Sequence, residues 1–254
     1  MMAQDRKTAL VTGASTGIGR AAVVALAEAG FDVAINYSRN DRAAAETADL
    51  ARAKSARTLL ARCDVADDAG VRQMLAAVEH EFGRLDALVN NAGITTTVPP
   101  KDFDSMTAEE WDRVFAVNVR GLFQVTRAAL PMLKKSRGSI VNTASIVGLR
   151  PGPQPLPYAS SKAAVINLTR LLALNLAPEI RVNAVAPGWM EGDWMERMLK
   201  DRYQDLMARR AKQTPLGRCA TAEDVAEVIV NLVTSNRFVN GEVIVIDGGY
   251  SATT

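Results

Sequence analysis

The sequence predicts an α/β fold in which one doubly wound, seven-stranded parallel sheet carries helices on both of its faces. Short β-branched apolar runs alternate with helical patterns along the chain, which is the rhythm of parallel strands joined by crossover helices. The 254 residues, 48% of them apolar, are enough to bury one large core without a second domain. Nothing resembling a linker or a repeat divides the chain, so we expect a single domain over residues 1–254.

Each expected strand is a short apolar run that ends at a polar or glycine-bearing turn. These runs lie at 9–11, 33–35, 58–61, 85–89, 139–142, 180–185 and 242–246. Sheets of this kind bind ligands at the carboxyl ends of their strands. The turns that follow these runs are therefore the places where we expect a site.

The expected helices fill the intervals between the strands. They run from the first glycine turn to Gly30, and over 41–54, 67–82, 107–135, 158–176, the later part of 189–212 and 221–234. Asp67 or Asp68 can cap the third helix, and Thr107 opens a capping box. Alternating prolines over 151–157 predict an extended loop before the next helix.

Composition excludes several classes of partner. The 30 basic and 28 acidic residues are spread along the chain for a net charge of +2, so we expect neither nucleic acid nor a membrane as partner. His80 is the single histidine, and Cys63 and Cys219 lie far apart, which argues against a metal site or a disulfide. Both cysteines are expected to be buried thiols. The N-terminus has no apolar leader, and we expect a cytoplasmic location.

A glycine-bearing turn follows the first expected strand. Its sequence is Thr12-Gly13-Ala14-Ser15-Thr16-Gly17-Ile18-Gly19. Glycine permits a positive φ and a close approach of a ligand to the backbone, and the following helix directs unpaired N–H groups at the same spot. The turn therefore predicts a phosphate-binding site. Its spacing alone is equally compatible with an ordinary strand-to-helix turn.

Tyr158 and Lys162 lie four residues apart in the expected helix over 158–176, a spacing that places both on one helix face. A free phenol has a pKa of about 10 and transfers protons poorly at neutral pH. A neighbouring ammonium favours the phenolate and would lower that pKa, so the pair predicts a general acid or base. The alternative is a surface lysine beside a half-buried tyrosine.

Two further polar residues accompany this pair. Ser145 lies at the end of the fifth strand, where its hydroxyl can donate a hydrogen bond to a substrate oxygen, although serine is also a common turn residue. Asn118 lies inside the long helix over 107–135, where asparagine is a mediocre helix former. A buried amide there would hold a water or interrupt the helix, but position alone favours an amide that faces solvent.

Together these residues resemble the classical short-chain dehydrogenase/reductases, and the resemblance extends from about Lys7 to Gly249. The matching motifs are Thr12-Gly13-x-x-x-Gly17-x-Gly19, Asp64-Val65, Asn90-Asn91-Ala92-Gly93, Asn118, Ser145, Tyr158-x-x-x-Lys162 and Pro187-Gly188. They occur in the order and at the spacings of that family, near its 3-oxoacyl-acyl-carrier-protein reductases. The resemblance implies a Rossmann-type fold and a site for a nicotinamide dinucleotide beside a carbonyl or alcohol substrate.

The resemblance also implies roles for individual residues. Tyr158 would protonate the carbonyl oxygen that Ser145 holds, Lys162 would bind the nicotinamide ribose and tune the phenol, and Asn118 would place a relay water. No metal is required, because hydroxyl donors polarise the carbonyl. The cofactor-binding residues would be Gly13, Ser15, Thr16, Gly17, Ile18, Gly19, Tyr37, Ser38, Arg39, Asp64, Val65, Asn90, Ala92, Gly93, Tyr158, Lys162, Pro187, Gly188 and Met190.

The end of the second strand bears on the choice of cofactor. An acidic residue there would bond a ribose 2′-hydroxyl and repel a 2′-phosphate. This chain has Tyr37-Ser38-Arg39, with no acid before Asp41, and an arginine can form a fork onto a phosphate. We therefore expect NADP(H) to be preferred, with NAD(H) as the alternative if Arg39 only faces solvent.

One segment departs from the family pattern. Related reductases often carry a threonine that bonds the nicotinamide carboxamide, and this chain has Gly192 at that position. Trp189, Met190 and Trp194 make the segment bulky, and we expect them to form an apolar substrate pocket. The remaining walls would be Val147, Leu149 and the loop through Pro157, with polar contacts from Thr95, Thr96 and Thr97. Alternatively, the tryptophans pack a lid onto the body.

Three functions are compatible with the sequence. The first is an NADP(H)-dependent reductase of a ketone, or the reverse oxidation of an alcohol, which includes an NAD-dependent alcohol or sugar dehydrogenase as a variant. The second is a nucleotide sensor that keeps the fold without chemistry. The third, a sugar-nucleotide epimerase or dehydratase, would need more chain. By resemblance we also expect a homo-oligomer, a tetramer or dimer, formed by the helix from Thr107 and by a C-terminal region with Phe238, Val239 and Tyr250.

Overall fold

A computed structural model describes residues 6–252 and contains one seven-stranded sheet. All strand pairs are parallel, and the spatial order is β3-β2-β1-β4-β5-β6-β7. The strands are β1 (Lys7–Val11), β2 (Phe31–Tyr37), β3 (Thr58–Arg62), β4 (Ala87–Asn90), β5 (Ser139–Thr143), β6 (Arg181–Pro187) and β7 (Val243–Ile246). The order reverses between β1 and β4, which makes that junction the switch point where ligands bind in open α/β sheets.

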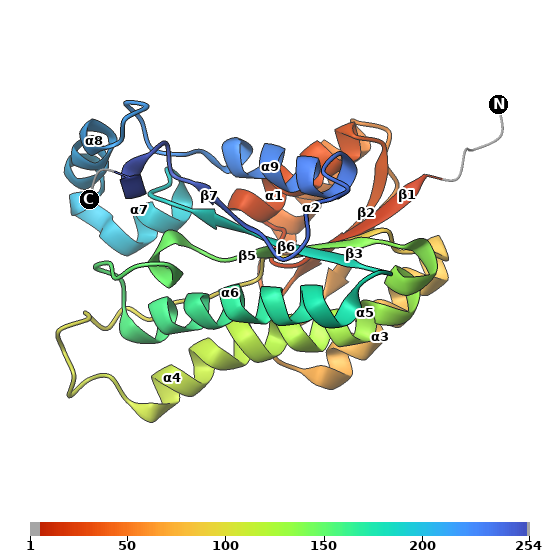
Figure 1. The fold of residues 1–254 in the computed structure, drawn as a ribbon, viewed down its shortest axis with the longest axis horizontal. Helices are drawn as coiled ribbons and strands as arrows, with labels where there is room; N and C mark the ends of the chain where they lie inside the picture. Colours follow the sequence, from red (N-terminus) through yellow and green to blue (C-terminus); the bar gives the residue numbers. More distant parts are fainter. Residues whose placement is uncertain (1–5, 253–254) are drawn as a thin grey trace.

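Helices cover both faces of the sheet (Figure 1). The first seven are α1 (Gly17–Glu28), α2 (Asp41–Arg52), α3 (Asp68–Phe82), α4 (Ala108–Phe115), the π-helical turn η1 (Ala116–Gly121), α5 (Leu122–Ser136) and the short 3₁₀ turn η2 (Ile146–Gly148). The others are α6 (Leu156–Leu176), α7 (Asp193–Leu199), η3 (Lys200–Arg202), α8 (Tyr203–Gln213), α9 (Ala222–Thr234) and η4 (Tyr250–Ala252). One layer contains α1, α2 and α9, and the opposite layer contains α3, α4, α5 and α6. The predicted doubly wound α/β fold is confirmed.

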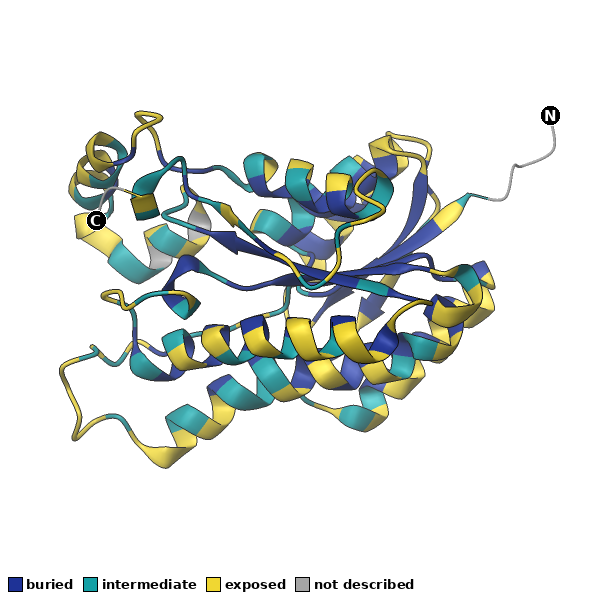
Figure 2. Ribbon diagram, in the orientation of Figure 1, coloured by how far each residue is buried: buried dark blue, intermediate teal, exposed yellow. Residues whose placement is uncertain are grey.

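The central strands are buried along almost their whole length, as Figure 2 shows by colour. One apolar cluster joins β1, β2 and β4 to α1 and α9, and includes Val11, Leu26 and Ile229. A second cluster on the other face includes Leu88, Leu133 and Ile140. Burial on both faces explains why the strands read in the sequence as continuous apolar runs rather than as alternating patterns.

The long helix predicted over 107–135 is interrupted, which is the alternative that a buried Asn118 implied. The chain forms α4, then a π-helical turn from Ala116 to Gly121, then α5. Asn118 lies in this turn with its side chain buried, so the solvent-facing amide that position alone favours is also wrong. Single π turns of this kind are often found at functional sites.

Other differences concern boundaries. The segment 189–212 contains two helices, α7 and α8, joined by η3, where the sequence predicts a loop and one helix. Asp67 is the residue that caps α3, and Thr107 caps α4 through the backbone N–H of Glu110. Cys63 and Cys219 are both buried free thiols, as expected. None of the described helices is both long enough and apolar enough to pass through a membrane.

A buried chain of polar side chains links the sheet to the helices below it. The Asn142 side chain on β5 accepts a hydrogen bond from Asn90 Nδ2 (2.9 Å) and donates one to Thr169 Oγ1 on α6 (2.9 Å). Asn90 Nδ2 also donates to Thr126 Oγ1 on α5. All four side chains are buried, so each depends on the others for its hydrogen bonds. This chain fixes β4, β5, α5 and α6 at the end of the sheet where a site is expected.

We expect Asn142→Leu to destabilise the protein by about 2–4 kcal/mol, because it leaves the Asn90 amide and the Thr169 hydroxyl buried without their partner. Urea unfolding followed by circular dichroism measures the loss. Asn175→Leu makes the same chemical change at an exposed position on α6 and should cost less than ~1 kcal/mol. Equal losses in the two variants would contradict the proposed role of the buried chain.

Candidate functional site

The site begins where the turns after β1 and β4 meet at the switch point. The backbone N–H groups of Asn91 and Ala92 both donate to Thr12 Oγ1 (3.0 Å each). The Asn91 side chain donates in return to the carbonyl oxygens of Thr12 and Gly13 (3.1 and 3.0 Å). A Cβ on Gly13 would lie 2.8 Å from the Ala92 Cα, so only glycine allows this approach. The sequence placed Asn91 in the Asn90-Asn91-Ala92-Gly93 motif but gave it no role, and the structure shows that it joins the two turns.

The glycine turn leads directly into α1. Gly13 and Gly17 have φ of +60° and +56°, in the left-handed region that favours glycine. Thr16 occupies the N-cap of α1, but its side chain makes no capping hydrogen bond. The first-turn N–H groups of α1 therefore face the turn without a side-chain cap, which is the arrangement that favours an anion. That this turn binds a phosphate stays a prediction, and its backbone geometry fits one.

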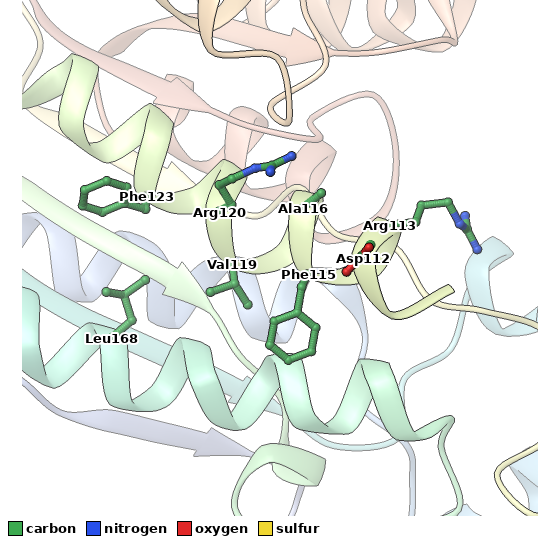
Figure 3. Close-up of a pocket in the computed structure, with 8 residues that line it drawn as sticks. All are labelled: Asp112, Arg113, Phe115, Ala116, Val119, Arg120, Phe123 and Leu168. Carbon is green, nitrogen blue, oxygen red and sulfur yellow. The ribbon is translucent and has the colours of Figure 1, made fainter. Parts of the chain in front are cut away.

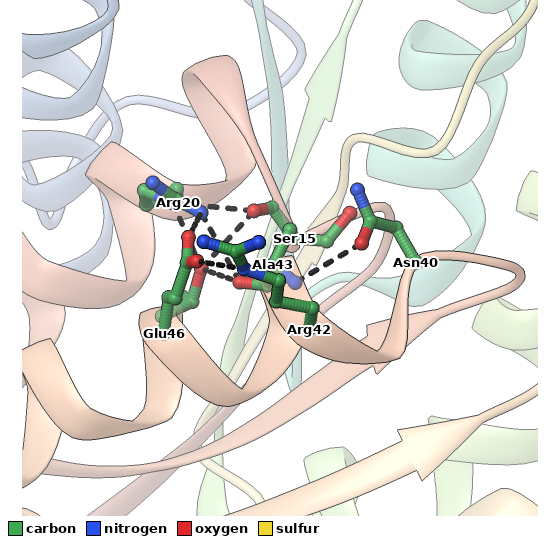
Figure 4. A network of polar contacts seen from close by, with 7 residues as sticks. Ser15, Arg20, Asn40, Arg42, Ala43 and Glu46 are labelled. Atoms are coloured by element: carbon green, nitrogen blue, oxygen red, sulfur yellow. Dashed lines mark hydrogen bonds and ion pairs between the residues drawn. The ribbon is translucent and has the colours of Figure 1, made fainter.

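Two side chains that the sequence did not single out support this turn. Asn36 on β2 accepts from the backbone N–H of Gly13 (3.3 Å) and donates to the carbonyl oxygens of Ala61 and Cys63 (3.0 Å each). Arg20 donates to the Ser15 carbonyl oxygen (3.2 Å) and to Thr47 Oγ1 on α2 (3.0 Å). Figure 4 shows how the contacts of Arg20 with Ser15, Ala43 and Glu46 connect the turn to α2, with Arg42 and Asn40 nearby.

The other residues that we expected to contact the adenosine half of the cofactor lie in different environments. Asp64 is exposed just after β3 and accepts from the backbone N–H of Ala66, while Val65 beside it is buried against Gly121. Ala92 and Gly93 lie at the switch point after β4. Asn90 instead directs its amide nitrogen into the core, where it belongs to the buried chain described above. A ligand therefore meets the backbone near Asn90 more readily than its side chain.

The end of β2 leaves two predicted side chains open to solvent. Ser38 and Arg39 are exposed, and among residues 6–252 the Arg39 guanidinium has no hydrogen bond or ion pair. Tyr37 is buried and donates to Asp41 Oδ1 (2.9 Å), and Asp41 lies 3.6 Å from a guanidinium nitrogen of Arg62 at the end of β3. Burial and the neighbouring carboxylate raise the pKa of the Tyr37 phenol. Asp41, the first acidic residue after β2, therefore interacts with Tyr37 on one side and with Arg62 on the other.

Ser145, Tyr158 and Lys162 converge at the carboxyl end of β5. Ser145 follows the strand and caps η2, and its hydroxyl donates to the Pro187 carbonyl oxygen (3.4 Å). Lys162 donates from Nζ to the Thr143 carbonyl oxygen (2.7 Å) and lies 5.6 Å from the centroid of the Tyr158 ring. Tyr158 and Lys162 are 7% and 5% exposed, so the alternative of a surface lysine is wrong.

The direction of the phenol shift differs from the prediction. Burial raises the pKa of Tyr158 above its ordinary value, and the interaction with the Ser145 hydroxyl only partly opposes this. Burial also lowers the pKa of Lys162, to about 8. The net shift of the Tyr158 pKa is therefore opposite to the predicted one, because desolvation of the buried phenol is the larger effect.

Asn118 lies behind this pair. Its amide nitrogen donates to the Ile94 carbonyl oxygen and to Ser161 Oγ (2.9 Å each), and its Oδ1 accepts from the Ile94 N–H (2.8 Å). Ser161 in turn donates to the Tyr158 carbonyl oxygen (2.7 Å). A Cβ placed on Gly93 would lie 3.5 Å from Asn118 Oδ1 and 3.7 Å from Lys162 Nζ. The amide thus connects η1, the loop after β4 and the first turn of α6.

The segment after β6 closes over the same region. The Gly188 N–H donates to the Ile246 carbonyl oxygen (2.9 Å), and Met190 packs partly buried against the core of the α1 face. Gly192 has φ +123° and donates its N–H to the Tyr203 hydroxyl (3.2 Å). Trp194 on α7 meets the Tyr158 ring edge-on, with centroids 5.7 Å apart. The tryptophan therefore covers the phenol, as the lid interpretation predicts.

A cavity of about 90 Å³ opens beside Ser145, a volume that leaves room for only a few atoms. Its walls come from η2, the proline loop, the segment after β6 and η4. Val147 and Trp189 line it as predicted, but Leu149 is exposed and lies outside the lining, and the three threonines at 95–97 are not part of it. Ile146, Pro151 and Pro153 add apolar walls, while Arg150, Gln154 and Tyr250 add polar ones, so the cavity is of mixed character rather than wholly apolar.

A larger surface hollow of about 810 Å³ shares no lining residue with this cavity. Figure 3 shows the residues that line it. Phe115, Val119 and Phe123 line it on α4, η1 and α5, together with Leu168 on α6 and the charged residues Asp112, Arg113 and Arg120. It is broad and open, and it contains neither the glycine turn nor the Ser145, Tyr158 and Lys162 set. Of the predicted catalytic residues, Ser145 lines the smaller cavity and none lines this hollow.

The chain matches known proteins over almost its full length. The family described as Enoyl-(Acyl carrier protein) reductase matches residues 13–251. A Streptomyces violaceoruber protein named as ketoacyl reductase 2 of the granaticin polyketide synthase is 41% identical over 249 residues, which cover 97% of each chain. The 3-oxoacyl-acyl-carrier-protein reductase FabG of Staphylococcus aureus is 38% identical over 246 residues, covering 96% of this chain and 97% of that protein.

A solved structure gives the same result for the fold. The gluconate 5-dehydrogenase of Burkholderia cenocepacia, determined in complex with NADP and tartrate, superposes with a TM-score of 0.88. It is 33% identical, and the match covers 98% of this chain and 96% of that one. The sheet order and these relatives therefore agree on the fold and on the family.

We expect Lys162→Met to be more stable than the wild type near neutral pH, by an amount that shrinks as the pH rises. The unfolded lysine has a pKa near 10.5 and the buried one a pKa of about 8, so the unfolded state binds more protons between these values. The wild type therefore gains stability, roughly 3 kcal/mol, from pH 7 to 10.5, and the methionine variant lacks this gain.

Unfolding free energies measured in urea at pH 7, 9 and 10.5, without nucleotide, test the difference between variant and wild type. The matched control is Lys135→Met, at an exposed position on α5. Its difference from the wild type should stay constant over this range. A constant difference for Lys162→Met as well would contradict a desolvated ammonium at this position.

Proposed function

Because the chain belongs to the classical short-chain dehydrogenase/reductase family, whose oxidoreductase chemistry it shares, we propose that it is an NADP(H)-dependent ketone reductase that transfers hydride reversibly. The observation that carries this proposal is the convergence of Ser145, Tyr158 and Lys162, half-buried or buried, at the carboxyl end of β5, next to the cavity that Ser145 lines. A protein that only senses a nucleotide would have no need to bury a phenol and an ammonium together.

The bound dinucleotide supplies the hydride, and the chain supplies its placement. The glycine turn and the N-terminus of α1 suit the pyrophosphate, because it is an anion. Hydrogen bonds from Asn36 and Asn91 fix the backbone of this turn. Asp64 and Val65 suit the adenine, and Gly93 with Lys162 suits the nicotinamide ribose. The backbone after β6, from Pro187 to Met190, suits the nicotinamide, since Gly192 has no side chain with which to bond its amide.

The proton comes from Tyr158. A substrate ketone enters the cavity with its oxygen toward the Ser145 hydroxyl, which donates a hydrogen bond and polarises the carbonyl. Because the pKa of Tyr158 is raised, its phenol is protonated at neutral pH and donates to the oxygen that becomes the alcohol. The Lys162 ammonium stabilises the phenolate that remains. A relay water would restore the proton, and Asn118 can hold it only through the second lone pair of Oδ1, because both of its amide hydrogens are already donated to Ile94 and Ser161.

The cofactor preference rests on the end of β2. Arg39 is exposed and has no partner among the described residues, while Asp41, the first acid, is held by Tyr37 and Arg62. A guanidinium that is not committed elsewhere can bond a 2′-phosphate, whereas a carboxylate in that place would repel it. These features favour NADP(H) over NAD(H).

The assembly and location are part of the same proposal. The hollow formed by Phe115, Val119 and Phe123 is an apolar surface on α4, η1 and α5, where the sequence predicts a contact between copies. We propose that the protein forms a homo-oligomer, a dimer or tetramer, through this face and through the region of the exposed Phe238. Two free buried thiols suit a reducing cytoplasm.

Tyr158→Phe should lower the turnover of ketones by about 10²–10⁴-fold, because it removes the proton donor. The Kd for NADPH, measured by the quenching of tryptophan fluorescence, should remain within about threefold of the wild-type value. Initial rates of NADPH oxidation are measured on a panel of ketones, β-ketoacyl thioesters, quinones and sugars, with an enoyl thioester included to test reduction of a carbon–carbon bond.

Tyr203→Phe is the matched control, since it removes the same hydroxyl from a tyrosine on α8 outside the cavity. It should retain most of the wild-type rate. Normal turnover in Tyr158→Phe would refute the proton-transfer role, and NADPH binding without oxidation of NADPH by any carbonyl would favour a nucleotide sensor.

Arg39→Ala should reduce kcat/KM for NADPH by about tenfold or more and leave kcat/KM for NADH nearly constant, because only NADPH carries the 2′-phosphate. Arg42→Ala removes a guanidinium three residues away that is already paired with Glu46, and should change neither. Equal use of both cofactors by the wild type, or an unchanged preference in Arg39→Ala, would reject the assignment.

A further inference from the structure

An amide side chain without a hydrogen-bond partner lies in the wall of the cavity beside Ser145. Gln154, from the proline loop that leads into α6, lines this cavity together with Ser145. Its Oε1 is buried and accepts no hydrogen bond from any of the described residues. Burial of an amide oxygen without a donor is unfavourable, because the oxygen loses its bonds to water and gains none from the protein. Few buried polar atoms are left in this state, and those that are often serve a function.

The sequence of the loop explains why the chain does not satisfy this amide. Residues 151–157 are Pro-Gly-Pro-Gln-Pro-Leu-Pro, and their four prolines have no backbone N–H to donate. Gly152 leaves space for the amide, because a Cβ there would lie 2.8 Å from Oε1 of Gln154 and 2.9 Å from Cγ1 of Val147. The Val147 side chain on that wall offers only methyl groups. The loop therefore places an amide at the cavity and supplies no donor for it.

The same loop fixes where the amide lies. A proline restricts its own φ and also the conformation of the residue before it, so Pro153 and Pro155 limit the backbone on both sides of Gln154. Pro155 is also the N-cap residue of α6, whose first turn carries Tyr158. Gln154 is therefore tied to the helix that positions the phenol, and it lines the cavity that Ser145 lines. A group bound by this amide would lie close to the reacting carbonyl.

We propose that the Gln154 amide binds a hydroxyl group next to the carbonyl of the substrate, so that the preferred substrate class is a small α-hydroxy ketone. This inference rests on the proposed function and adds the substrate class. A hydroxyl both donates and accepts, so it can pair with the oxygen or with the nitrogen of the amide. The cavity of about 90 Å³ has room for only a few atoms, which keeps this hydroxyl close to the carbonyl that Ser145 holds.

The reaction is balanced without any further reactant. Hydride from NADPH adds to the carbonyl carbon, the Tyr158 proton adds to the carbonyl oxygen, and the neighbouring hydroxyl stays intact, so the product is a vicinal diol. A site built to bond a hydroxyl discriminates strongly against an analogue without it, because the buried amide is then left unpaired and shielded from water. The expected signature is therefore selectivity between two ketones of equal size.

The test compares hydroxyacetone with butan-2-one, which carries a methyl group in place of the hydroxyl, as substrates for NADPH oxidation. In the wild type, kcat/KM for hydroxyacetone should exceed that for butan-2-one by about tenfold or more. Gln154→Met keeps the length of the side chain and removes both ends of the amide, and the ratio should fall about tenfold. The two ketones differ in intrinsic reactivity, but this difference is the same for both enzymes and cancels when their ratios are compared.

Gln73→Met is the matched control, because it makes the same change at an exposed position on α3 outside the cavity. Its ratio should equal that of the wild type. If Gln154 only packs the proline loop, its loss changes kcat/KM for both ketones by the same factor, and that unchanged ratio overturns the inference. A wild type that reduces butan-2-one as well as hydroxyacetone overturns it without any variant, and leaves the reductase proposal standing. Failure to oxidise NADPH with any carbonyl overturns both.

Discussion

The site depends on one buried contact, the hydrogen bond from the Lys162 ammonium to the Thr143 carbonyl oxygen (2.7 Å). It fastens the first turns of α6 to the carboxyl end of β5, and thereby places Tyr158 beside Ser145. An ammonium this deeply buried pays a desolvation penalty, which appears as the lowered pKa of about 8. The fold tolerates that penalty only because surrounding polar groups fix the strand end against which the lysine lies.

Those polar groups include four asparagines that stabilise the structure in the same way. Asn36, Asn91, Asn118 and Asn142 each extend from a strand, a strand-end turn or the π-helical turn, and each bonds a backbone or side chain of a different element. An amide side chain can donate and accept at once, so a single asparagine joins two segments without adding charge. The carboxyl edge of the sheet is therefore rigid before any ligand binds, which lowers the cost of ordering the site.

Sequence reasoning reached the fold and most of the candidate site because both follow from local patterns. Strands buried on both faces read as apolar runs, and Tyr158 and Lys162 share a helix face through their spacing. The π turn at Asn118 escaped prediction because apolar periodicity barely changes when one turn takes an extra residue. Arg150 and Tyr250 are 100 positions apart, and only the folded chain brings them to one cavity.

The shift of the Tyr158 pKa was predicted in the wrong direction for a related reason. Spacing gives the distance between two groups but not the solvent around them, and burial is the larger effect here. The outcome suits reduction. At neutral pH the buried pair holds a neutral phenol and a cation, and donation of the phenol proton turns an unbalanced charge into an ion pair.

The two groups are therefore coupled: loss of the proton from Tyr158 raises the affinity of Lys162 for its own proton by the same free energy. The pair donates more easily than the raised pKa of an isolated phenol would suggest, because the ammonium gains a partner in the same step. Alcohol oxidation starts from the opposite protonation state and must first create that ion pair by removing a proton to solvent. The protonation state of the resting pair thus fits the proposed reduction of a ketone.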